Sequence, residues 1–184
     1  MKIKDICTIL FSIPIKNDTP NIEKNFWVTQ ADLKENNVTE VNESYSDFNL
    51  ETCLKPEKYD ILIKRSKPTY VNIYEGDKDA YLGNNILILR TKGFDVRYLA
   101  FVIEQQLEKL NAMTNNSTAT KALNRDMLEN IEISEIDKNR QKIIGQIWYL
   151  SKKKNQLFDE LLLKEKLKQK IIQQKIYNNL GEIK

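Results

Sequence analysis

Residues 143–161 read IIGQIWYLSKKKNQLFDEL, and this stretch decides the architecture of the C-terminal part of the chain. Its apolar side chains recur at spacings of four, three, seven and four residues, which is the heptad pattern of a coiled-coil helix. A helix with one apolar stripe cannot cover that stripe alone, so we expect the seam to be a dimerisation surface. The seam consists of Ile143, Ile147, Leu150, Leu157 and Leu161.

The helical pattern extends in both directions from this seam. It begins near residue 138, and Gly181 is a natural stop after Leu180. At 1.5 Å per residue such a helix would be about 60 Å long, more than a small domain can cover. Gly145 costs about 1 kcal/mol relative to Ala inside a helix, so it indicates either a close helix contact or a bend. We therefore predict a long helix over residues 138–184 that follows a separate domain of residues 1–137.

The first part of the chain has a different character. All four prolines and three of the five glycines precede residue 94, and short β-rich runs lie between turn residues. The runs are 26–29, 59–63, 70–74 and 85–90. A helical stripe follows Asp95 as far as Leu110, and a short helix is expected near Asn124–Leu128. These patterns predict a mixed α+β (α/β) domain, with a buried first strand or helix in 6–13 and a polar loop over 42–47.

Charge is distributed unevenly along the chain. Residues 137–175 carry 11 basic and 4 acidic side chains, whereas residues 1–136 carry 17 basic and 21 acidic ones. The positive field thus belongs to the helix, where Lys152, Lys153 and Lys154 could follow a phosphate backbone or form an ordinary solvated face.

Several functional classes are excluded by the residues present. The chain has no His, and Cys7 and Cys53 form no CxxC pair, so a Cys/His zinc site and a histidine general base are absent. No phosphate-binding glycine loop or S-adenosylmethionine motif occurs, so we expect no cofactor. No apolar run approaches the roughly 20 residues of a membrane span, and we expect a cytoplasmic protein.

Candidate contacts to nucleic acid come from three places. Cations beside aromatic and amide groups occur in the run 64–74, a further cation follows the strand at 85–90, and the loop 115–121 is rich in hydroxyl and amide groups. An alternating exposed strand or a solvated loop would explain the same residues. The candidates are Lys64, Arg65, Lys67, Tyr70, Asn72, Lys92, Asn116, Ser117, Thr118 and Lys121.

From Tyr59 onward the chain resembles the DNA-specificity domain of type I restriction-modification specificity subunits. The run 59–64 (YDILIK) is similar to the family's Gly-Asp-Ile-Leu element, and 97–103 (RYLAFVI) to its Tyr-Leu-x-Tyr helix. The turn at 118–123, the segment 127–133 and Gln141-Lys142-Ile143-Ile144 follow in the family's order. Two departures are the missing prolines before Gln141 and the missing glycine at Asn115-Asn116-Ser117.

The resemblance implies a target recognition domain followed by the family's conserved spacer helix. Members commonly carry two of each, so a chain with one of each is expected to act as a half-subunit that homodimerises and reads one half-site of a bipartite target in double-stranded DNA. The expected partners are methyltransferase (M) subunits and possibly restriction (R) subunits. S-adenosylmethionine and ATP with Mg²⁺ would be bound by those partners, and this chain would be no enzyme.

Two alternatives remain open at this point. Asp60 with the nearby Lys64 faintly resembles the carboxylate and lysine of a metal-dependent nuclease, which would make the chain a small restriction endonuclease. The long helix would also suit a coiled-coil adaptor or an inhibitor of a restriction complex that binds only protein.

Overall fold

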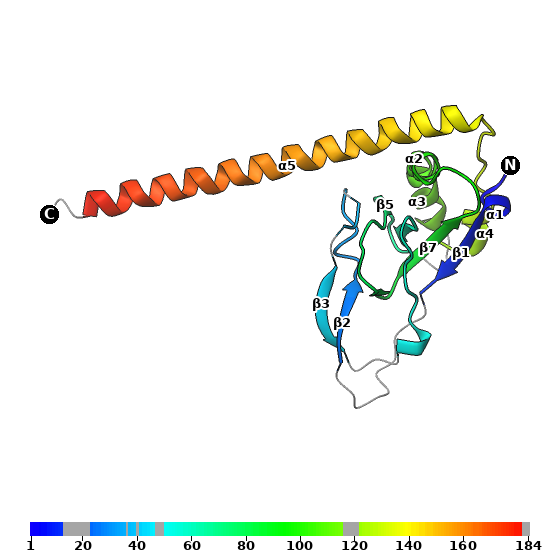
Figure 1. The fold of residues 1–184 in the computed structure, drawn as a ribbon, viewed down its shortest axis with the longest axis horizontal. Helices are drawn as coiled ribbons and strands as arrows, with labels where there is room; N and C mark the ends of the chain where they lie inside the picture. Colours follow the sequence, from blue (N-terminus) through cyan, green and yellow to red (C-terminus); the bar gives the residue numbers. More distant parts are fainter. Residues whose placement is uncertain (13–22, 36, 40, 47–49, 116–121, 182–184) are drawn as a thin grey trace. The chain divides into compact units, whose positions relative to one another are not determined.

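The computed structural model describes residues 1–12, 23–35, 37–39, 41–46, 50–115 and 122–181. The chain divides into two compact units, Met1–Tyr149 and Leu150–Lys184. The first unit is a mixed α+β domain, and a long helix runs from it through the second, as the sequence predicts (Figure 1). None of the helices in the described ranges combines the length and apolar character needed to cross a bilayer.

The centre of the first unit is a four-stranded antiparallel sheet in the order β1-β7-β4-β5. Its strands are β1 (Cys7–Phe11), β4 (Ile61–Lys64), β5 (Val71–Ile73) and β7 (Ile86–Thr91). The one-turn helix α1 (Ile3–Ile6) leads directly into β1. The apolar runs identified in the sequence therefore form this sheet, including the buried element expected at the N-terminal end of the chain.

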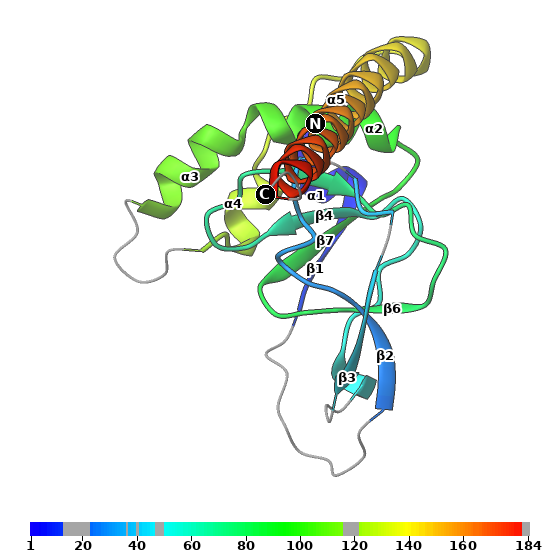
Figure 2. The same cartoon turned by 90° about the vertical axis from the view of Figure 1, so that its left-hand side faces the viewer.

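A second sheet has the order β3-β2-β6 and mixes antiparallel and parallel pairing (Figure 2). Its strands are β2 (Glu23–Val28), β3 (Asn42–Ser46) and β6 (Ala80–Leu82), and the short 3-10 helix η1 (Leu50–Thr52) follows β3. The expectation of a loop over residues 42–47 is wrong for 42–46. These polar residues form an edge strand, which needs apolar contacts much less than a central strand does.

Successive side chains of β4 and β7 point to opposite faces of the sheet and contribute to two hydrophobic cores. Ile61, Ile63, Leu87 and Leu89 face the helices of the domain, while Leu62, Ile86 and Ile88 face the second sheet with Val28 and Leu82. All of these side chains are fully or almost fully buried. Strands covered on both faces need continuous apolar sequence, which explains why 61–63 and 86–89 show no polar alternation.

Three helices cover one face of the four-stranded sheet (Figure 1). They are α2 (Val96–Gln105), α3 (Leu107–Asn115) and α4 (Arg125–Glu129). Asp95 caps α2 by accepting a hydrogen bond from the Tyr98 amide at 2.9 Å, and Asn124 caps α4 in the same way through Met127. The single helix expected from Asp95 to Leu110 is interrupted at Gln106, so it is two helices.

The long helix α5 (Lys138–Gly181) begins and ends within the predicted range. Asp137 caps it, because its carboxylate accepts hydrogen bonds from the amides of Asn139 and Arg140, both at 3.0 Å. Its first three turns, up to Tyr149, belong to the compact domain, which therefore extends beyond the boundary expected at residue 137.

Candidate nucleic-acid interface

One end of the four-stranded sheet collects the candidate cations that follow β4. Lys64 ends β4, and the antiparallel pairing of Ile63 with Val71 places Tyr70 at the same end. Lys67 is exposed, and Tyr70 retains 36% of its accessible surface. Lys64 and Arg65 are half-buried, so their stems pack on the domain while the sequence order keeps them next to Lys67.

The backbone at this end of the sheet is held in tight turns. Lys67 and Asn85 have positive φ angles of 48° and 67°, a conformation that L residues rarely adopt. The Arg65 amide donates to the Asn85 carbonyl at 2.8 Å, and the Ser66 hydroxyl to the Asn85 side-chain oxygen at 3.1 Å. Asn111 of α3 donates to the Pro68 carbonyl at 2.7 Å. The candidate cations are therefore carried on a fixed scaffold.

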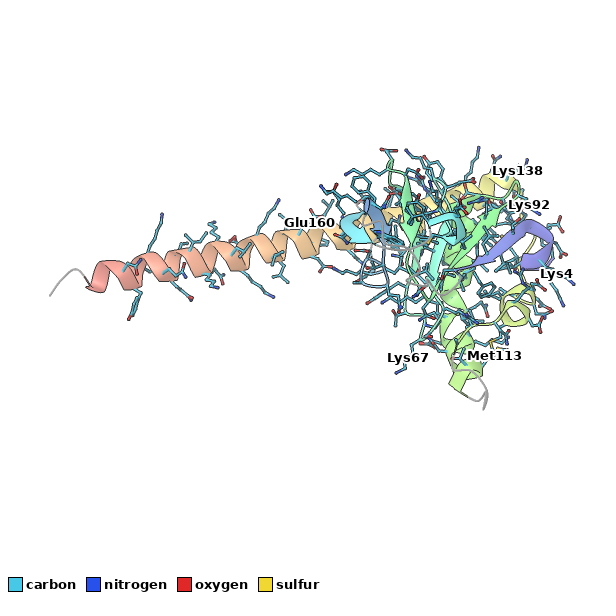
Figure 3. All side chains as sticks on the ribbon, turned by 90° about the horizontal axis from the view of Figure 1, so that it is seen from below. Lys4, Lys67, Lys92, Met113, Lys138 and Glu160 are labelled. Atoms are coloured by element: carbon cyan, nitrogen blue, oxygen red, sulfur yellow. The ribbon has the colours of Figure 1, made fainter. Side chains whose placement is uncertain are left out.

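Two of the predicted contacts do not belong to this surface. Asn72 is fully buried, and its amide donates to the Lys34 carbonyl at 2.6 Å, so it has a structural role and cannot reach DNA in this fold. Lys92 is exposed, but it follows Thr91, which pairs with Cys7 at the opposite end of the sheet. Figure 3 shows Lys67 and Lys92 on different sides of the domain.

Four further candidates, Asn116, Ser117, Thr118 and Lys121, lie outside the described residues. The structure adds two residues that the sequence analysis did not select, Phe11 at the end of β1 and Arg125 at the start of α4. The guanidinium carbons of Arg65 and Arg125 lie 5.3 and 5.5 Å from the centre of the Phe11 ring. Only the pairing of distant segments brings these three together, and no local sequence pattern would identify them.

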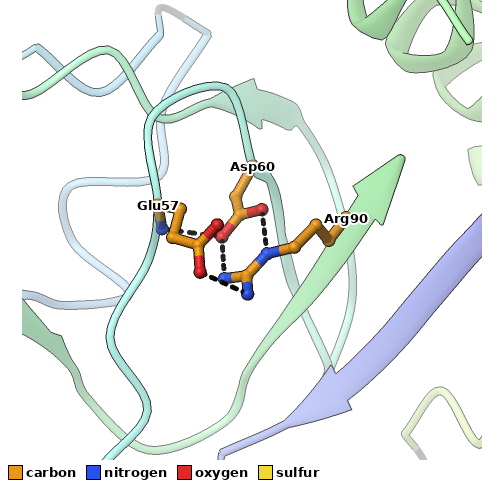
Figure 4. Close-up of polar contacts among 3 residues, drawn as sticks. All are labelled: Glu57, Asp60 and Arg90. Atoms are coloured by element: carbon orange, nitrogen blue, oxygen red, sulfur yellow. Dashed lines mark hydrogen bonds and ion pairs between the residues drawn. The ribbon is translucent and has the colours of Figure 1, made fainter. Parts of the chain in front are cut away.

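Asp60, the residue on which a nuclease interpretation depends, is occupied by an arginine (Figure 4). Arg90 donates to both of its carboxylate oxygens, at 2.9 and 2.7 Å, and the Glu57 amide donates to Oδ2 at 2.7 Å. Glu57 also pairs with Arg90 at 2.6 Å. The hydrogen bonds with Asp60 raise the pKa of Arg90, which remains charged. A metal would have to displace this guanidinium.

No other metal site is evident in the described ranges, where no three Cys, Asp or Glu side chains converge in a way that could hold an ion. The thiols also have structural environments. Burial raises the pKa of Cys7 to about 12, although Lys92 lowers it, and burial raises the pKa of Cys53 as well. Both thiols are therefore protonated at neutral pH and are poor ligands and nucleophiles.

The first turns of α5 are clamped onto α2 by polar and close-packed contacts. The side-chain oxygen Oε1 of Gln141 accepts a hydrogen bond from the Asp95 backbone amide at 3.3 Å, and its side-chain nitrogen Nε2 donates to the Ile136 carbonyl at 2.9 Å. A side chain at Gly145 would meet the Tyr98 amide nitrogen at 2.6 Å, so only glycine allows this approach. Of the two readings of Gly145, close contact is the correct one.

Further along, aromatic residues complete this joint. Trp148 is buried and donates its indole N–H to Glu104 of α2. The Tyr149 hydroxyl donates to Glu75 at 3.3 Å, while the Arg97 guanidinium lies 4.0 Å from the centre of the Tyr149 ring. Burial raises the pKa of Tyr149, and the nearby carboxylate of Glu75 raises it further. The joint explains the roles of Gln141, Gly145 and Trp148 in this sequence.

The seam positions of α5, in contrast to its buried residues Gln141 and Trp148, are exposed. The five predicted seam residues are exposed by between 53% and 61%. Lys152 is buried, whereas Lys153 and Lys154 are exposed, so the three lysines do not form one continuous solvated face. Large apolar side chains exposed in succession on one helix are a feature of surfaces that bind another protein.

Comparison with known proteins adds structural relatives only. No family model matches the chain, and no curated protein matches it. The HsdS subunit of Thermoanaerobacter tengcongensis superposes with a TM-score of 0.60 at 14% identity, over 91% of this chain and 39% of that one. A chain from a type I restriction-modification system gives 0.62 at 13% identity, over 94% of this chain and 42% of its own.

This chain has the fold of type I restriction-modification S subunits. The S subunit of M. genitalium gives a TM-score of 0.50 at 16% identity, over 80% of this chain and 37% of the other. The S-subunit fold therefore covers both the α+β domain and α5, and the chain spans about two fifths of the length of these solved chains.

Proposed function

We propose that this chain is the DNA sequence-specificity subunit of a type I restriction-modification system. It binds one half-site of a bipartite target through the domain of residues 1–149 and has no catalytic activity of its own. The observation that carries the proposal is the S-subunit fold, which extends over both the domain and the long helix. The sequence motifs support it independently, because they follow the order found in this family.

Homodimerisation through α5 is the second part of the proposal. The exposed seam from Ile143 to Leu161 has the heptad spacing with which two helices pack together. Two identical domains related by two-fold symmetry would read an interrupted palindrome, and the paired helices would set the distance between its halves.

The distal half of α5 carries more apolar surface than one partner helix can cover. Leu163 follows Leu161 by two residues, so it projects from nearly the opposite side of the helix. Leu167 follows Leu163 by four residues, about one turn further along the helix, and both side chains are at least half exposed. We assign this second side to a methyltransferase subunit, and restriction subunits would join through that complex.

Chemistry is then delegated to the partners. S-adenosylmethionine would be bound by the methyltransferase subunit, ATP and Mg²⁺ by a restriction subunit, and the complex would act in the cytoplasm. The Arg90 pair at Asp60 speaks against the nuclease alternative, because the carboxylate is already neutralised by a guanidinium. A protein-only adaptor remains the competing function, and it predicts no DNA affinity.

The test is to co-express the chain with a type I methyltransferase subunit in a host lacking other modification systems and to map methylated adenines across the genome. We expect methylation at one interrupted palindrome and only when this chain is present. Methylation at an asymmetric bipartite site would contradict homodimerisation. The absence of chain-dependent methylation, together with complex formation, would favour the adaptor.

A further inference from the structure

Two arginines lie beside one aromatic ring at the end of the four-stranded sheet where β4 ends. Arg65 comes from the turn after β4 and Arg125 from the start of α4, and their guanidinium carbons lie 5.3 and 5.5 Å from the centre of the Phe11 ring. Phe11 is half-buried at the end of β1 and packs against the core. The ring attracts each cation and restricts where both can lie.

Neutral acceptors fix the two guanidinium groups. Arg65 Nε donates to the Leu123 carbonyl and Arg125 Nη2 to the Ile9 carbonyl, both at 3.1 Å. The supporting backbone is itself tied, because the Leu123 amide donates to the Arg65 carbonyl at 2.8 Å. Each arginine thus donates one N–H to a backbone carbonyl. A guanidinium has five N–H donors in a planar fork, so further donors remain on each side chain.

The positive charge at this ring is only weakly compensated. Arg65 has no carboxylate partner among the described residues, and Arg125 has Glu129 four residues further along the same helix, at the long distance of 3.6 Å and with side chains 54% and 29% exposed. Arg90, in contrast, contacts two carboxylates at 2.6 and 2.7 Å. Two like charges held beside one ring repel each other, and an anion that accepts hydrogen bonds from both would relieve this repulsion.

We propose that Arg65 and Arg125, positioned by Phe11, bind a phosphodiester of the DNA backbone. A phosphate offers the oxygens that guanidinium forks match in pairs, and Lys64 and Lys67 add positive charge close to Arg65 in the sequence. Arg65, Arg125 and Phe11, called the arginine bracket below, would hold the domain on the duplex without reading bases, because phosphates are the same at every position. This inference rests on the proposed DNA-binding function and assigns one part of it to named residues.

The experiment measures binding of the full chain to two fluorescent duplexes of unrelated sequence, by anisotropy over a series of salt concentrations. Arg65→Gln and Arg125→Gln should each weaken binding to both duplexes by a similar factor, about tenfold at low salt. Removing both arginines together should reduce the slope of log affinity against log salt by about 0.9, the value for one lost phosphate contact, and each single variant should reduce it by less. Arg125→Lys should keep the slope but lose part of the affinity.

Two variants protect this test from trivial causes. Arg140→Gln removes an exposed arginine at the start of α5, which pairs with Asp137, and should leave affinity and slope unchanged. Phe11→Leu keeps an apolar side chain but removes the ring, so it should weaken binding without removing a charge. Thermal unfolding of each variant identifies any loss of affinity that is caused by loss of fold.

Three results would overturn the inference. If wild type binds with a salt-dependent affinity and both glutamine variants keep it, the arginine bracket is wrong and the proposed function stands. If the variants lose affinity for only one of the two duplexes, the arginines read bases and do not grip the backbone. If wild type binds neither duplex, even with the methyltransferase subunit, the proposed function fails and the arginine bracket fails with it.

Discussion

At the scale of single residues, the largest expected effect on stability comes from the buried charge of Asp60. Asp60 is 2% exposed and depends on the guanidinium of Arg90, whose side chain is 32% exposed. Arg90→Met should lower the free energy of unfolding by about 2–3 kcal/mol, because it leaves a buried carboxylate without its partner. This loss is smaller than the roughly 3–5 kcal/mol for breaking a fully buried pair, because solvent reaches Arg90 and screens the interaction. Urea unfolding measures this difference.

The matched control is Lys58→Met, which breaks an ion pair with Asp77 at 2.5 Å whose side chains are 50% and 83% exposed. Solvent screens that pair, so little change in stability is expected. Equal losses for the two variants would show that burial does not determine the importance of the Arg90 pair.

Cys7 gives the domain a dependence on alkaline pH. Burial raises its folded pKa to about 12 from an ordinary 9.0, so above pH 9 the unfolded chain loses this proton while the folded chain keeps it. The contribution of the buried Cys7 thiol to the free energy of unfolding is complete below pH 9. It is lost as pH rises toward 12, at about 1.4 kcal/mol per pH unit. Tyr74 and Tyr98, whose pKa values burial also raises, act in the same direction.

Cys7→Ala removes the thiol and should therefore reduce the slope of unfolding free energy against pH between 9 and 11, even though the smaller side chain lowers stability at neutral pH. Chemical denaturation at several pH values measures both proteins. Parallel slopes would mean that the Cys7 thiol ionises in the folded state as readily as in the unfolded chain.

At the scale of elements, Gly145 gives the clearest test of the joint between α2 and α5. Gly→Ala inside a helix normally stabilises it by about 1 kcal/mol. Here the added methyl group would lie 2.6 Å from the Tyr98 nitrogen and 2.7 Å from Asp95 Oδ1, so we expect Gly145→Ala to destabilise the domain by about 1–3 kcal/mol. Differential scanning calorimetry measures the change.

Ser151→Ala is the control, since it lies at an exposed position of the same helix and should raise stability slightly or leave it unchanged. If Gly145→Ala is as stable as Ser151→Ala, the close approach of α5 to α2 is absent in solution.

The elements also show where sequence reasoning works. The runs at 61–63, 71–73 and 86–90 are strands because their apolar residues fill two cores, and the caps Asp95 and Asn124 begin helices as expected. The strand Asn42–Ser46 escapes detection because an edge strand is stabilised by its pairing with β2, and its own sequence is polar. The interruption at Gln106 has no glycine or proline to announce it.

The candidate site was less predictable than the fold. Lys64, Arg65, Lys67 and Tyr70 could be selected because they are neighbours in sequence, whereas Phe11 and Arg125 join them only through tertiary pairing. Asn72 has a residue type that suits a base contact, but it is buried in β5 because its side chain donates to the Lys34 carbonyl, which is distant in sequence. Composition identifies the chemistry of an interface, and topology decides which residues belong to it.

At the scale of the whole molecule, the proposed function depends on two copies of the chain pairing through α5. Light scattering of the purified protein, coupled to size-exclusion chromatography, tests this most directly. We expect a particle of twice the 21.6 kDa chain mass, and the double substitution Leu157→Lys and Leu161→Lys, which places charges on the exposed seam, should convert it to a monomer. A wild-type mass of 21.6 kDa at micromolar concentration, unchanged when the methyltransferase subunit is added, would contradict it.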